Sequence, residues 1–192
     1  MDWLRAHVAR FCDGPDHARR RGLILAELQR VSPVELQKRV RDCATEPGGH
    51  VRILADCLGL RDVSSETVAA AAAAYLPPAP VTAEADRAVV ELVAACGGVP
   101  DEATAARISI LIQACASTAA LVANARPFGG EDALDRALAE NPPVRRTCRM
   151  VDGVVTEVDI AAAGLPFGAG PHECPGRAHA LALAGGVLEG SR

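Results

Sequence analysis

The pattern of polar and apolar positions along the first half of the chain is that of successive helices. One helix is predicted from Pro33 to about Ala44, because it opens with a capping box, Ser32-Pro33-Val34-Glu35, that has proline at the first helical position. A second is predicted from about His50 to Leu58, where Gly59 can adopt the left-handed conformation that ends helices. The alanine run 69–74 predicts a third helix, which we expect to pack and which the proline-rich stretch 76–80 ends.

The rest of the chain adds two helices and a hairpin signal. Thr82 can cap a helix that closes at Gly97-Gly98, and Asp101 opens a long helix that ends before Pro127. Asp152-Gly153 lies between the stretches 144–151 and 154–160, which is the pattern of a two-residue hairpin turn. We therefore expect a mainly α fold, a single domain over residues 1–192, with one short β-hairpin.

Composition narrows the class of protein. Hydrophobic residues make up 49% of the 192 residues, enough for the core of one domain, yet no uninterrupted apolar run is long enough to span a bilayer. The N-terminus is charged within its first residues and lacks a signal-peptide core, so we expect a cytoplasmic protein without membrane contact. The seven cysteines lack framework spacing and are expected to be thiols. A net charge of −4 and only 3% aromatic residues give no case for nucleic-acid binding.

The most specific motif is a glycine-rich loop that presents one cysteine, Phe167-Gly168-Ala169-Gly170-Pro171-His172-Glu173-Cys174-Pro175-Gly176. Its three glycines permit backbone dihedrals that other residues avoid, and Pro175 stands where a helix to about Leu188 would start. Free N–H groups at that helix start would hydrogen-bond the Cys174 sulfur and help to keep it ionised. The residues alone leave open a zinc site or an unliganded loop, although no CxxC or HxxxH accompanies the His-x-Cys pair.

This loop resembles the haem-ligand loop of the cytochrome P-450 family, in which a cysteine thiolate is the axial ligand of the haem iron. The resemblance implies that Cys174 binds the iron of haem b (iron protoporphyrin IX) and that thiolate donation favours O–O cleavage. It also implies that Phe167 shields the sulfur and that His172 reaches a haem propionate. The loop glycines belong to the same implied cofactor site: Gly168, Gly170 and Gly176.

Two further stretches resemble family segments that hold the haem propionates. Residues 11–21 look like the segment that enters the family's C helix, where His17 and Arg21, one helical turn apart, would face a propionate. Arg149 matches a family arginine that binds the other propionate. From the residues alone, the first stretch also fits an ordinary solvated basic helix, and Arg149 fits a surface position on a strand.

The long helix resembles the family's I helix, which crosses the distal face of the haem. Ala114 is small enough to let a flat macrocycle approach the helix backbone. Gap-free alignment puts Ser117 at the position of the family's alcohol and Ala116 at that of its acid, so the hydroxyl is kept and the carboxylate is lost. Ser117 or Thr118 would then position water in place of the acid. The alternative is a serine that bonds back to its own helix carbonyls.

The chain also departs from the family pattern. Residues 135–144 resemble the end of the K helix, but the family's E-x-x-R pair would fall on Arg136 and Ala139. In the family this ion pair locks the fold around the haem, so its absence puts both stability and turnover in question. The chain has about half the length of a family member, which implies a truncated P-450-like fold without much of the substrate pocket.

These observations predict a haem-thiolate protein that oxygenates a small organic substrate, as a mono-oxygenase or with peroxide. The dioxygen route would need a ferredoxin or reductase as redox partner, and the missing acid favours peroxide. One alternative is a non-catalytic haem-binding or protein-binding accessory. Another is a degenerate product or fragment that never loads haem. Uncovered apolar surface in a truncated chain would also favour a homodimer.

Overall fold

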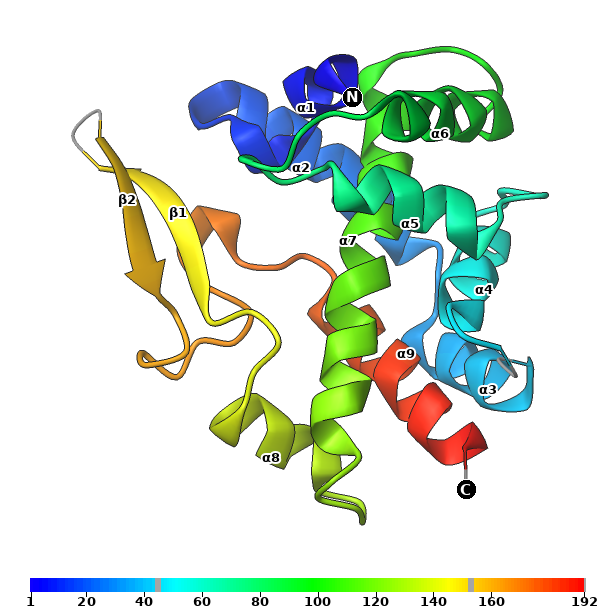
Figure 1. The fold of residues 1–192 in the computed structure, drawn as a ribbon, viewed down its shortest axis with the longest axis vertical. Coiled ribbons are helices and arrows are strands. Elements are labelled where there is room, and N and C mark those ends of the chain that lie inside the picture. The colour runs from blue at the N-terminus through cyan, green and yellow to red at the C-terminus, as the bar shows by residue number, and fades with distance from the viewer. Residues whose placement is uncertain (44–45, 152–153, 192) are drawn as a thin grey trace.

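Helices make up most of the structure, a computed structural model that describes residues 1–43, 46–151 and 154–191, and of 149–151 the backbone alone. The described part is mainly α with one antiparallel pair of strands, as predicted (Figure 1). In chain order the elements are α1 (Asp2–His7), α2 (Gly14–Gln29), α3 (Pro33–Cys43), α4 (Gly49–Cys57), α5 (Ser65–Ala73), α6 (Ala83–Ala95), α7 (Glu102–Ala125), α8 (Ala133–Glu140), β1 (Arg146–Val151), β2 (Val154–Asp159) and α9 (Arg177–Gly190).

For the helices before residue 127, the predicted starts and ends are confirmed where the structure describes them. The hydroxyl of Thr82 accepts the amide of Ala85 at the start of α6, and the carboxylate of Asp101 accepts that of Thr104 at the start of α7. Gly59 has a φ of 77°, the left-handed value expected just after α4. The predicted end of α3 at Ala44 and the hairpin turn 152–153 lie outside the described residues.

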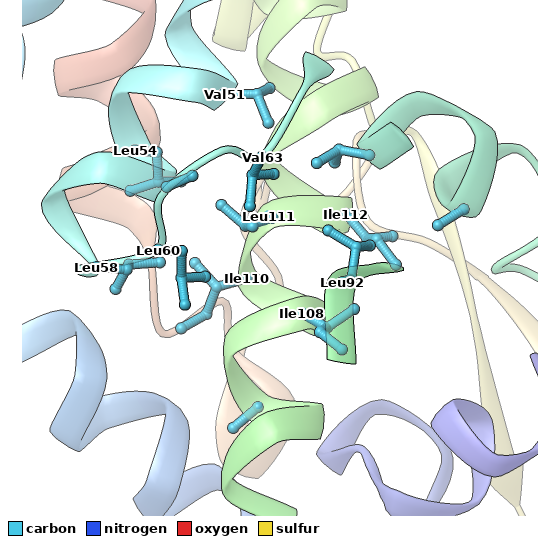
Figure 2. Packing of buried hydrophobic residues seen from close by; sticks show 14 of the residues in the cluster. Val51, Leu54, Leu58, Leu60, Val63, Leu92, Ile108, Ile110, Leu111 and Ile112 are labelled. Carbon is cyan, nitrogen blue, oxygen red and sulfur yellow. The ribbon is translucent and has the colours of Figure 1, made fainter. Parts of the chain in front are cut away.

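Helix α7 is the centre of the molecule, and the other helices surround it (Figure 1). Figure 2 shows its apolar face packed against side chains of α4, α6 and the segment after α4. Leu92, Ile108 and Leu111 are at most 1% exposed. A smaller cluster joins the C-terminal end of α7 to α8 and α9.

The length and composition of α7 would also allow a membrane span. Among the described residues it is the one helix that meets this test, and 50% of its most apolar window is buried inside the fold. The core helix of a soluble protein has the same properties, so this helix gives only weak evidence of a membrane span. The cytoplasmic location stays a prediction.

Two sets of contacts fix the helices that flank the cysteine loop. Glu102 at the start of α7 accepts hydrogen bonds from both Arg19 and Arg20 of α2 at 2.8 Å. Farther along, α9 crosses α3 at Gly186, where an added Cβ would lie 2.6 Å from the carbonyl oxygen of Gln37. The loop therefore leads into a helix whose position is set by close backbone contact.

Candidate functional site

The cysteine loop doubles back on itself ahead of α9. Gly168 and Gly170 have φ values of 73° and 70°, in the left-handed region that favours glycine, as predicted. The amide of Cys174 donates to the carbonyl of Phe167 at 2.9 Å, which closes the loop. The Phe167 ring lies 5.2 Å from the guanidinium carbon of Arg177, the first residue of α9.

Two expectations for the end of this loop are wrong. Gly176 has a φ of −100°, which any residue can adopt, so its backbone does not require glycine. Pro175 lies in a turn, and α9 begins at Arg177, because the chain makes this extra turn before the helical hydrogen bonds start. Cys174 is therefore three residues ahead of the helix rather than at its first turn.

The surroundings of the Cys174 sulfur act on its charge in opposite directions. Burial raises the pKa of the Cys174 thiol above its ordinary value, while a hydrogen bond from the Gly176 N–H and the charges of Arg21 and Arg10 oppose this rise. This N–H group belongs to the turn ahead of α9 and not to the helix itself. Burial has the largest effect, so the surroundings favour the neutral thiol, although a backbone donor and two guanidinium charges act in the direction that a thiolate ligand needs.

The start of α2 meets the cysteine loop. The rings of His17 and His172 lie 3.9 Å apart between centroids, although 155 positions separate the two residues in the sequence. The Arg21 guanidinium donates to the backbone carbonyl of Glu173 at 2.6 Å, and Nε2 of His172 lies 2.8 Å from a carboxylate oxygen of Asp13. The structure thus brings together three of the side chains that the resemblance assigned to propionates, because His17 and Arg21 of α2 contact loop residues 172 and 173.

Sequence reasoning missed Arg10, which links the loop to α7. Its guanidinium donates to the side-chain oxygen of Gln113 at 3.2 Å, and its charge acts on the Cys174 thiol. Gln113 directly precedes Ala114, but neighbouring positions of a helix do not share a face, and Ala114 packs against the main hydrophobic core instead. Arg10 lies ahead of the motif that starts at Asp13, so the motif gave no signal for it.

The two predicted hydroxyl groups of α7 differ in their environment. Ser117 donates to the carbonyl of Gln113, one turn back, which is the alternative that the sequence left open. Thr118 is 1% exposed, and its hydroxyl has no hydrogen-bond partner among the described residues. Ala116 is exposed and Ala114 is partly buried.

A hollow of about 180 Å³ lies beside the junction of α2, the loop and the hairpin. Ligand pockets for small organic molecules typically measure about 300–1,000 Å³, so the hairpin or the loop must move before a macrocycle can enter. The side chain of Cys174 is not part of its lining. The described residues that line it are Arg10, Phe11, Cys12, Asp13, Cys148, Val155 and His172.

The structure adds little about the predicted roles of Arg149 and Arg136. Arg149 lies in β1 opposite Thr156, but its side chain is outside the described part of the chain. Arg136, at the E-x-x-R position, pairs within α8 with Glu140 at 3.3 Å and covers the Phe128 ring at 4.4 Å. Within the described ranges, no three His, Cys, Asp or Glu side chains gather closely enough to hold a metal ion. A haem-thiolate iron takes one protein ligand, so its donor set fits this loop.

The chain matches no protein-family model, no curated protein and no solved structure. The resemblance to the cytochrome P-450 family therefore depends on the quoted motifs and on the geometry that joins them.

Proposed function

We propose that this chain is a haem-thiolate protein related to the cytochromes P-450, with Cys174 as the iron ligand. The meeting of α2 with the cysteine loop carries the proposal. His17 and Arg21 were assigned to propionate binding from one motif and His172 from another, and in the structure they adjoin. The proposal is supported because basic side chains from two distant segments meet beside the loop that presents Cys174.

The residues of the site would divide the work of holding haem b. Cys174 would supply the sulfur ligand, and the Gly176 N–H would stabilise the charge on it. Arg21, His17 and His172 would bind the propionates through charge-assisted hydrogen bonds. Arg149 would bind the second propionate. Bound haem would supply oxygen activation, as it does in haem-thiolate enzymes.

The groups on the distal side of the site favour slow or absent turnover. The second candidate function is therefore that of a non-catalytic haem-binding accessory. Ala116 provides no carboxylate, and the Ser117 hydroxyl is held by the Gln113 carbonyl. Thr118 is then the remaining hydroxyl that could orient water or peroxide, and it is buried. A non-catalytic haem-binding accessory would need none of these groups. The catalytic hypothesis also includes three proposals: peroxide-driven oxygenation of a small organic substrate, a ferredoxin or reductase as redox partner, and a homodimer.

The decisive experiment is a spectrum of the haem-loaded protein. The chain is expressed with a haem supply, reduced and exposed to carbon monoxide, and the Soret band is recorded. We expect a strongly red-shifted band that Cys174→Ala loses. Cys96→Ala is the matched control, because Cys96 is also partly buried but lies at the end of α6.

The outcomes separate the candidates. A red-shifted band together with substrate oxidation by peroxide supports the catalytic reading. The same band without any oxidation supports the accessory. Equal bands in Cys174→Ala and the wild type, or no haem uptake at all by a folded chain, would refute haem-thiolate ligation.

A further inference from the structure

Asp13 makes an unusual contact for a residue at the start of a helix. It occupies the N-cap position of α2, where an aspartate normally accepts a backbone amide of the first turn. Its side chain makes no such bond in the structure, and its carboxylate instead lies 2.8 Å from Nε2 of His172. The carboxylate is therefore directed from the helix that it should cap toward the cysteine loop.

Asp13 occupies the place in which the carboxylate of a bound ligand would accept a hydrogen bond from His172. An imidazole Nε2–H is a single donor and serves one strong acceptor at a time. His172 is only 20% exposed at its side chain, and its ring lies against the ring of His17 at 3.9 Å between centroids, so it has little freedom to turn to a second acceptor. Arg21 is different, because a guanidinium has five N–H donors and can keep the Glu173 carbonyl while binding another group.

We propose that Asp13 is an internal competitor that holds His172 in the ligand-free chain and must release it when a haem propionate binds. This inference rests on the proposed haem-binding function. The Asp13 side chain is 74% exposed, so the contact is that of an exposed pair and its effect is small. Asp13 thus lowers the affinity for haem without being part of the bound site.

The test titrates the ligand-free protein with ferric iron protoporphyrin IX at fixed pH. Asp13→Asn is the informative variant, because asparagine caps helices as well as aspartate does but lacks the charge that strengthens the bond to His172. We expect Asp13→Asn to bind haem about two- to fivefold more tightly, the range of an exposed ion pair. Asp16→Asn is the matched control. It removes the same charge three residues away, where the carboxylate contacts Arg19 instead, and should leave the affinity unchanged.

A second background shows whether the effect passes through His172. In His172→Ala, the Asp13→Asn change should give no further gain in affinity. The dimethyl ester of the same porphyrin has no free carboxylates, so its binding should also be insensitive to Asp13→Asn. Equal gains in the Asp13 and Asp16 variants, or a gain that persists in His172→Ala, would overturn the competition. A wild-type chain that binds no haem would overturn the proposed function and this inference together.

Discussion

Gly186→Ala should destabilise the fold, because α9 and α3 touch at this point without room for a side chain. An alanine Cβ would lie 2.6 Å from the carbonyl oxygen of Gln37, and 2.8 Å from Cβ of Val40. Neither atom can rotate away, since one belongs to the backbone and the other is the branch point of its side chain. The two helices would have to move apart.

The expected cost follows from two opposing effects. Overpacking a tight contact costs about 1–3 kcal/mol, while alanine in place of glycine inside a helix returns about 0.5–1 kcal/mol. The net loss should be about 1–2 kcal/mol in the free energy of unfolding. For a chain of this size that lowers Tm by about 2–8 °C.

Urea and thermal unfolding followed by far-UV circular dichroism measure this loss. Gly22→Ala is the matched control, because Gly22 lies in α2 and an added Cβ meets nothing within 4 Å. That variant should gain about 0.5–1 kcal/mol. Gly185→Ala should fall between the two, since its closest neighbour is the mobile end of Gln37 at 3.2 Å. Equal stabilities for the Gly186 and Gly22 variants would refute the close crossing.

Two further predictions concern ionisable groups. Burial lowers the pKa of His50, so the folded chain keeps this ring neutral, and the stability it contributes is present above its ordinary value of 6.5 and falls as the pH drops below it. The urea midpoint should therefore decrease from pH 7.5 to 5.5 more steeply in the wild type than in His50→Leu; parallel slopes would contradict this. Hydrogen bonds from Arg19 and Arg20 lower the pKa of Glu102 to about 2, so its contribution is present above its ordinary 4.5 and is lost toward pH 2. Glu102→Gln should cost up to about 1 kcal/mol at pH 7, and this difference should shrink through that window; a constant difference would exclude the ion pairs as its cause.

The sequence predicted the helices well because their ends carry local signals. Thr82, Asp101 and Gly59 act within one helical turn of themselves, so no distant contact is needed to place them. The loop glycines 168 and 170 were predicted correctly for the same reason. At Gly176 the prediction was wrong, because the start of α9 depends on how the turn at Pro175 closes and the motif does not specify this.

Contacts between distant segments could not be predicted in the same way. The motifs named His17, Arg21 and His172, yet the bond from Arg10 to Gln113 joins segments 103 positions apart and follows only from how the segment ahead of α2 lies beside α7. The contact of Asp13 with His172 also could not be predicted from the sequence, because 159 positions separate the two residues. Motifs identify donor groups, whereas the fold decides which acceptors they meet.

The size of the hollow depends on the hairpin, whereas the positions of the donor groups beside it depend on more firmly packed parts of the fold. The donors are on α2 and on the loop before α9, which ion pairs and a close helix crossing hold in place. The wall formed by Cys148 and Val155 belongs to the hairpin, and a two-stranded ribbon is marginally stable by itself. Val154 on its other face is 64% exposed, so that face adds little packing energy. The hairpin is therefore the element whose displacement widens the hollow at least cost, while the donor groups keep their positions.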